Sequence, residues 1–115
     1  MIAKRTEVWR SSFLAQEVTV ARWGEDGRPV LLFPTAGGDA EEVERFRMVD
    51  ALAPLVRAGR IQLFSCDSVP GQCWVSDAYP ASHCSWVQNR FDEFLYFELA
   101  PYMRHLAGER NEILT

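Results

Sequence analysis

The hydrophobic and polar positions near the N-terminus predict two β-strands and a turn. Apolar and polar residues alternate from Glu17 to Trp23, and a more mixed segment, Thr6 to Leu14, precedes them. A period of two is typical of a strand with one buried face. The segment 24–27 then predicts a turn, because its glycines adopt positive φ angles that other residues avoid. We expect a strand pair at the edge of a sheet.

Two later segments predict buried strands. Pro29–Phe33 is continuously apolar and ends at Pro34, and Ile61–Asp67 is short and largely apolar. A strand that is apolar at every position is covered on both faces, as central parallel strands are. Between them, Ala40–Gly59 carries apolar residues at spacings of three and four, which predicts a helix with one buried face. Pro54 is expected to kink or divide this helix.

The C-terminal part predicts a long loop, a helix and a last strand. Ser68–Val87 shows no clear period, whereas an apolar face begins near Asn89, with a kink expected at Pro101 and an end at Gly108. Residues 111–115 predict one more strand. Strands alternating with helices indicate an α/β fold with parallel strands and crossover helices. A last strand without a covering helix would offer unpaired backbone groups to another chain.

Composition and charge narrow the range of functions. The chain has 115 residues, enough for one domain with its own core, and a formal net charge of −4. Lys and Arg are not concentrated anywhere, so we expect no nucleic-acid partner. No apolar stretch is long enough to span a membrane, and the N-terminus has no signal-peptide pattern. We therefore expect no membrane partner and a cytoplasmic location.

The cysteines and histidines offer few candidates for chemistry. Cys66, Cys73 and Cys84 are an odd number, so in a reducing compartment no disulfide is expected. No C-x-x-C or H-x-x-x-H spacing is present, so we expect neither a metal site nor a cofactor. His83 adjoins Cys84, but adjacent side chains point apart and no orienting third group is identifiable. His105 falls near the end of the last helix, where a surface role is favoured.

Several segments together resemble a known family. They are the strand 30–35 with Ala36-Gly37-Gly38 after it, the strand 63–68 with Trp74 beyond it, and the helical run from Asn89 to Arg104. Their order and spacing resemble the bacterial putative esterases related to esterase D, over about residues 18–115. The resemblance implies that residues 1–115 are the N-terminal part of a single α/β-hydrolase domain, with two edge strands followed by parallel strands and crossover helices.

The resemblance also implies where the catalytic groups lie. In that family the strand that matches residues 111–115 leads into a G-x-S-x-G nucleophile elbow, and the acid and histidine come later. None of the triad is then expected in this chain. The loop after the third strand supplies one oxyanion-hole amide. The resemblance assigns that amide to Ala36, with Thr35 as the neighbouring candidate.

Other residues near this loop are candidates for substrate contact. Gly37 and Gly38 would let a ligand approach the backbone, although a glycine pair is also a simple turn signal. Trp74 is expected to line an acyl or alcohol pocket, and packing against the sheet is an equal alternative. Packing is favoured for Tyr79 and Trp86.

Structural roles are also considered for the residues at the end of the second parallel strand and for a group of acidic residues. Asp67 and Ser68 lie at the carboxyl end of a strand, where ligands bind in open α/β sheets, and turn capping is an equal alternative. The acidic residues Glu41, Glu42 and Glu44 are expected to form a solvated helix face.

Three functions remain open at this point. The leading hypothesis is the N-terminal portion of a serine esterase or acyl hydrolase for a small ester, whose triad lies on a following or separate chain. That C-terminal half is the expected partner. The alternative is a non-catalytic, hydrolase-like interaction module that associates through its terminal strand. A redox or thiol enzyme that uses Cys66, Cys73 or Cys84 is the third.

Overall fold

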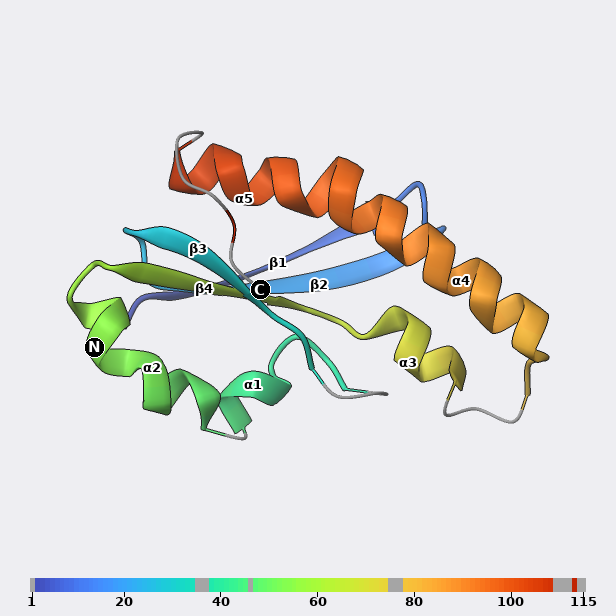
Figure 1. Cartoon of the computed structure of the whole chain (residues 1–115), viewed down its shortest axis with the longest axis horizontal. Helices are drawn as coiled ribbons and strands as arrows, with labels where there is room; N and C mark the ends of the chain where they lie inside the picture. Colours follow the sequence, from blue (N-terminus) through green and yellow to red (C-terminus); the bar gives the residue numbers. More distant parts are fainter. Residues whose placement is uncertain (1, 35–37, 46, 75–77, 109–112, 114–115) are drawn as a thin grey trace.

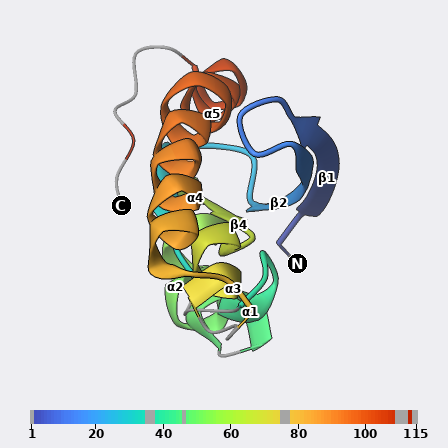
Figure 2. The same ribbon diagram turned by 90° about the vertical axis from the view of Figure 1, so that its right-hand side faces the viewer.

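A computed structural model describes residues 2–34, 38–45, 47–74, 78–108 and 113. The N-terminal elements are β1 (Lys4–Ser11), β2 (Gln16–Trp23), β3 (Arg28–Leu32), α1 (Glu42–Arg45) and α2 (Met48–Arg57). They are followed by β4 (Ile61–Cys66), α3 (Val69–Trp74), α4 (Ala81–Phe94), the π-helical segment η1 (Leu95–Leu99) and α5 (Ala100–Ala107). Figure 2 shows that α4, η1 and α5 form one continuous column, with β1 and β2 on one side of it.

The strands form a mixed sheet in the order β1-β2-β4-β3. β1 and β2 are an antiparallel hairpin, and β2 is antiparallel to β4. β3 runs parallel to β4, with Arg28 opposite Ile61 and Leu32 opposite Ser65. The predicted strand pair and the parallel pair are both confirmed. Within the described residues, however, β3 has a strand neighbour only on the β4 side, so it is an edge strand there and not the central strand that its apolar pattern predicted.

Helices cover both faces of the sheet (Figure 1), with α1 and α2 on one face and the α4–α5 column on the other. The core on the α4–α5 side contains Val18, Val20, Leu31, Phe64, Cys66, Val69, Phe91, Phe94, Leu99 and Met103. The core on the α1–α2 side contains Ala21, Trp23, Ala40, Val43, Val49, Val56 and Leu63. β4 contributes to both cores, which explains why its sequence is largely apolar.

Two expectations about the helices are corrected by the structure. The helix predicted over 40–59 is divided, but the break is at Arg47, whose φ of 63° is left-handed, while Pro54 lies inside α2. The segment predicted as a loop over 68–87 contains α3 and the beginning of α4. Its Ser, Pro, Gly and Trp content hides the helical period, and α4 starts directly after the extended Pro80.

The end of the chain is partly as predicted. Gly108 follows α5 with a φ of 88°, which only glycine adopts readily. The π-helical turn η1 lies just before Pro101, where a kink was expected. The strand predicted over 111–115 lies outside the described residues apart from Ile113. Among the helices that the structure describes, none is sufficiently long and apolar to cross a membrane.

Candidate functional site

The topology points to one place for a ligand. β3 leads into the α1–α2 layer, whereas its parallel neighbour β4 leads into α3 and α4 on the opposite face. Where adjacent strands send their connections to opposite faces, a crevice opens outside their carboxyl ends, and open α/β sheets bind ligands there. The candidate site is therefore expected between the ends of β3 and β4.

A pocket of about 400 Å³ lies at this position, and we call it the switch-point pocket. Its wall consists of Phe33, Pro34, Ser68, Pro70, Gly71, Trp74, Gln88, Phe91, Asp92 and Leu95. The volume falls within the range of roughly 300–1,000 Å³ that is typical of small-molecule sites. Most of the wall is apolar or aromatic, and the Gln88 amide donates to the Asp92 carboxylate at 3.5 Å. The pocket thus combines an apolar body with a few polar groups that could orient a ligand.

The loop predicted to carry the oxyanion hole borders this pocket through Pro34. Thr35, Ala36 and Gly37 lie outside the described residues, so their roles stay predictions. Gly38 is described, and its carbonyl accepts a hydrogen bond from the Ser68 amide at 3.1 Å. A Cβ on Gly38 would collide with the carboxylate of Glu42, whose Cδ would lie 2.7 Å away. Only glycine fits here without displacing that carboxylate.

Asp67 has a structural role at the end of β4. Its carboxylate accepts hydrogen bonds from the amides of Ala40 and Thr19, both at 3.0 Å. These bonds fasten the exit of the loop after β3 to the end of β4 and to the middle of β2. Of the two roles considered for Asp67, the structure shows the capping role, while Ser68 beside it lines the pocket.

Glu41, Glu42 and Glu44 were predicted to form a solvated helix face, but they are not uniformly exposed. Glu42 is buried, with 6% of its surface exposed. The Lys4 ammonium donates to Glu41 and Glu44 at 2.7 Å each, and the Trp23 indole donates to Glu44 at 2.8 Å. The bonds from Lys4 and then Trp23 lower the pKa of Glu44, and those to Glu41 and Glu44 raise the pKa of Lys4. The cluster fastens the start of β1 to α1.

The aromatic residues of the predicted loop fall into two groups. Trp74 ends α3 and lines the switch-point pocket with half of its surface exposed, and its substrate-binding role stays a prediction. Tyr79 and Trp86 stack on His83, with ring centroids 4.9 and 5.8 Å apart, and the Arg90 guanidinium lies 5.4 Å from the Trp86 ring. These rings pack against one another along α4 and do not line the pocket.

The prediction that the cysteines form no disulfide is wrong. Cys73 and Cys84 are bonded, with their Cα atoms 5.6 Å apart, and the bridge joins α3 to α4. Closing a loop of this size stabilises a fold by about 3 kcal/mol in chain-entropy treatments. The prediction rested on cysteine number and an assumed reducing compartment, and neither reveals which two cysteines meet in space.

The structure does not favour the thiol enzyme that the sequence left open. Cys84 is held in the bridge, so it is not a nucleophile beside His83. Cys66 is fully buried, and burial raises the pKa of its thiol to about 12, so thiolate is scarce at neutral pH. In the described part of the chain, neither histidine lines the switch-point pocket. There too, no three His, Cys, Asp or Glu side chains are grouped to hold a metal ion.

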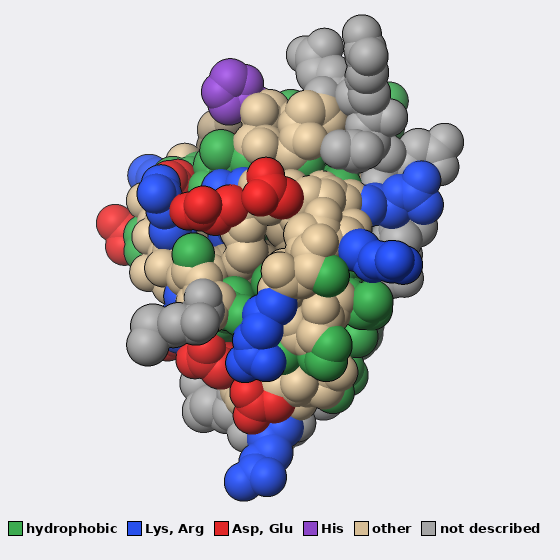
Figure 3. Space-filling view, turned by 90° about the vertical axis from the view of Figure 1, so that its left-hand side faces the viewer, with side chains coloured by type: hydrophobic (Ala, Val, Ile, Leu, Met, Phe, Trp, Pro, Cys, Tyr) green, Lys and Arg blue, Asp and Glu red, His purple; other side chains and the backbone are tan. Residues whose placement is uncertain are grey.

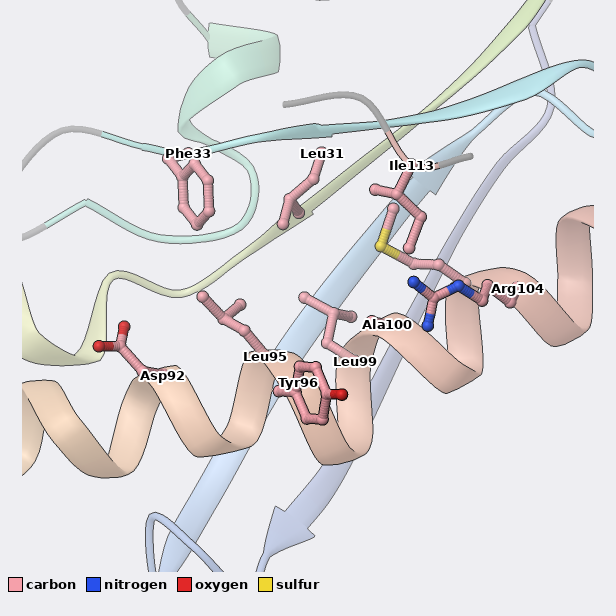
Figure 4. A pocket seen from close by; sticks show the side chains of 10 residues that line it. Leu31, Phe33, Asp92, Leu95, Tyr96, Leu99, Ala100, Arg104 and Ile113 are labelled. Atoms are coloured by element: carbon pink, nitrogen blue, oxygen red, sulfur yellow. The ribbon is translucent and has the colours of Figure 1, made fainter. Parts of the chain in front are cut away.

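A second apolar cavity of about 340 Å³, which we call the β3 groove, lies between β3 and the helical column (Figure 4). Leu31 and Phe33 line one side, and Leu95, Tyr96, Leu99, Ala100 and Met103 line the other. Figure 4 shows Asp92 toward the Phe33 end and Arg104 beside Ile113 toward the other. The groove therefore follows the outer edge of β3, with an acidic and a basic group at opposite ends.

Charges elsewhere are mixed. Figure 3 shows acidic and basic side chains interspersed on the face that it presents. Phosphate recognition relies on a concentration of basic groups, and on that face the basic groups alternate with acidic ones.

The fold and the site together define an α/β protein with a sheet covered on both faces and a pocket at the carboxyl ends of its parallel strands. Its fold is that of esterase-like proteins. A ferulic acid esterase structure superposes with a TM-score of 0.67 over 98% of this chain and 49% of that chain, at 13% identity. The S-formylglutathione hydrolase FrmB from Staphylococcus aureus superposes with a TM-score of 0.50 over 84% of this chain and 43% of that one, at 6% identity.

At these identities the likeness concerns the fold. The chain spans about half the length of the structures that it matches. No protein-family model matches the sequence, and no curated protein matches it.

Proposed function

We propose that this chain is the N-terminal portion of a serine esterase or acyl hydrolase that acts on a small ester. The observation that carries the proposal is the switch-point pocket, which lies beside the loop after β3 in a fold shared with esterases. In this proposal the Ser, acid and His of the triad lie on a following or separate polypeptide, the C-terminal half of the hydrolase.

The proposed contribution of this chain is an oxyanion-hole donor and a pocket wall. Attack on an ester creates a tetrahedral oxyanion, and losing one positioned N–H donor costs about 3–4 kcal/mol of transition-state stabilisation. The amide of Ala36, or that of Thr35, would donate to this oxygen. The bonds from Ser68 to Gly38 and from Ala40 to Asp67 support the role, because they fix the end of the same loop.

The remaining wall of the pocket would receive the substrate itself. Trp74 and Phe91, with the backbone of Gly37 and Gly38, would contact the acyl or alcohol group of the ester. Two polar groups of the wall, Gln88 and Asp92, suit an orienting role because they already contact each other at 3.5 Å.

Crossover geometry supports a place for the C-terminal half. The β3-to-β4 connection lies on the α1–α2 face and moves toward β2, whereas the chain leaves β4 on the opposite face. Crossovers between parallel strands keep one hand, so two crossovers on opposite faces move in opposite directions. The next parallel strand, which is the one predicted over residues 111–115, would therefore lie beyond β3, beside the β3 groove that Ile113 already lines, and the C-terminal half would add beyond it.

The test combines this chain with a polypeptide that carries the elbow and the histidine. A fluorophosphonate probe that labels activated serines is added to each polypeptide alone and to the mixture, and labelled chains are separated on a denaturing gel. We expect label on the partner only, and only in the mixture, together with hydrolysis of phenyl butyrate. A complex that forms without label or hydrolysis would reject the catalytic proposal.

A second candidate function is a non-catalytic interaction module. Among the described strands β3 pairs only with β4, and this outer edge of β3 and the apolar β3 groove favour the module, because an unpaired strand edge accepts an added strand. The terminal strand through which this association was predicted lies outside the described residues apart from Ile113. The module predicts a stable complex without serine labelling, which the same gel distinguishes from the esterase.

A further inference from the structure

The wall of the switch-point pocket that carries Trp74 is a weak element by itself. α3 has six residues and includes Pro70 and Gly71, two poor helix formers. Helices this short are not stable in isolation, so α3 depends on its attachments. Trp74 is half exposed, and burial therefore holds its ring only in part. The preceding residue, Cys73, is buried and bonded to Cys84 of α4.

The other end of the bridge lies on the face of α4 that forms the opposite wall. Cys84, Gln88, Phe91 and Leu95 follow one another at spacings of four, three and four residues, which places them on one side of the helix. The last three line the switch-point pocket. The disulfide therefore connects the two walls directly, one residue before Trp74 on one side and one turn before Gln88 on the other.

We propose that Cys73 and Cys84 are positioning residues of the switch-point pocket, whose bridge holds the Trp74 wall against α4, so that reduction by a dithiol opens the pocket. The proposal concerns the shape of the pocket and does not require that it hydrolyse esters. A ligand that contacts both walls binds more weakly to the reduced chain. If the intact pocket persists in one molecule in ten, the affinity falls about tenfold.

The reduction step is ordinary thiol–disulfide exchange. One thiolate of the dithiol attacks a bridge sulfur, the S–S bond breaks, and the released cysteine takes a proton. The second thiol of the dithiol then displaces the mixed disulfide, so the dithiol becomes a cyclic disulfide and both cysteines become thiols. Cys73 also lines a separate cavity of about 200 Å³ beside Tyr79 and His83, which offers a small dithiol a route to the bridge.

The first measurement counts thiols with iodoacetamide on the air-oxidised chain. We expect one labelled cysteine after unfolding without reductant and three after reduction, because Cys66 is the unpaired one. Three labels without reductant would overturn the proposal at once.

The second measurement compares the oxidised and dithiothreitol-reduced chain under native conditions. We expect the exchange of the amides of residues 69–74 to accelerate by a larger factor after reduction than the exchange of the amides of α2 and β2. Acrylamide should quench the Trp74 fluorescence more strongly, as judged by difference from Trp74→Phe. The affinity for phenyl butyrate, followed by saturation-transfer NMR, should fall about tenfold, and reoxidation should restore it.

Matched variants distinguish a disulfide that positions the pocket wall from one that only stabilises the whole fold. Cys73→Ser/Cys84→Ser should behave like the reduced chain and ignore dithiothreitol, while Cys66→Ala should keep the full response. Unchanged exchange at 69–74 and unchanged phenyl butyrate affinity after reduction would overturn the proposal. So would exchange that accelerates in α2 and β2 by the same factor as at 69–74, because the bridge would then stabilise the whole fold and hold the pocket wall no more than the rest. The reversibly reduced chain keeps the test valid if the double variant does not fold.

Discussion

At the scale of single residues, Gly38 is fixed by a neighbour rather than by its own backbone angles. The carboxylate of Glu42 occupies the space that a Cβ on Gly38 would need. We expect Gly38→Ala to lower the free energy of unfolding by about 1–3 kcal/mol, because the buried Glu42 must move in a packed region. Urea denaturation measures the loss. In a Glu42→Ala background the same substitution should cost clearly less, and equal costs in both backgrounds would contradict the contact.

The Cys66 thiol makes a contribution to the stability of the fold that decreases at high pH. Burial raises the pKa of its thiol from 9.0 to about 12, so between these values the unfolded chain loses the proton and the folded chain keeps it. Stability is full below pH 9.0 and falls as the pH rises toward 12, by about 1.4 kcal/mol per unit. Urea denaturation of the native chain and of Cys66→Ala should therefore converge over this range. A constant difference between them would argue that the thiol titrates normally.

At the scale of elements, the Lys4 cluster joins the first strand to the first helix. Lys4 lowers the pKa of Glu44, so this carboxylate stabilises the fold above its ordinary pKa of 4.5, and the contribution is lost as the pH falls through the lowered value. Glu44 is 43% exposed, so solvent screening limits the effect to about 1 kcal/mol or less.

Urea denaturation at about pH 7 and about pH 3 measures this contribution. Glu44→Gln should be less stable than the native chain at the higher pH and should lose less stability on acidification. The control is Glu17→Gln, which removes an exposed carboxylate from β2. If both variants respond to acid alike, Lys4 and Glu44 are not coupled.

The strands could be predicted from the sequence better than the helices. β2 alternates and β4 is largely apolar, and both patterns follow directly from which faces are covered. α3 and the start of α4 were missed because Pro70, Gly71 and Pro80 punctuate them and α3 is held by a disulfide. A covalent bond between residues eleven apart leaves no periodic signal.

The candidate site was predicted only in part, because some of its residues come from segments far apart in the sequence. The ends of β3 and β4 could be located because strand ends are readable, and Trp74 was singled out beyond them. Phe33, Gln88 and Asp92 were not, because they become neighbours only when α4 crosses the end of the sheet. Spatial convergence of distant segments is set by packing, which a single sequence does not display.

At the scale of the whole molecule, the two edges of the sheet differ in a way that association can reveal. The β3 edge borders the apolar groove, and Phe33 and Tyr96 beside it are 49% and 72% exposed. The opposite edge is β1, where Val8 is 56% exposed. Because about half or more of each side chain is already in water, replacing them with glutamate should leave the fold intact, which circular dichroism can check.

If the partner adds beside β3, Phe33→Glu and Tyr96→Glu should each weaken its binding by at least about tenfold, since each places a charge in an apolar interface. Val8→Glu should leave the affinity unchanged. Isothermal titration of each variant with the proposed C-terminal half measures this. If instead Val8→Glu weakens binding and the other two substitutions do not, the partner adds its strand beside β1 and not on the β3 side. Crossover geometry permits the next parallel strand beyond β3 only, so this outcome would contradict the proposed completion of the sheet and the esterase assembly that depends on it.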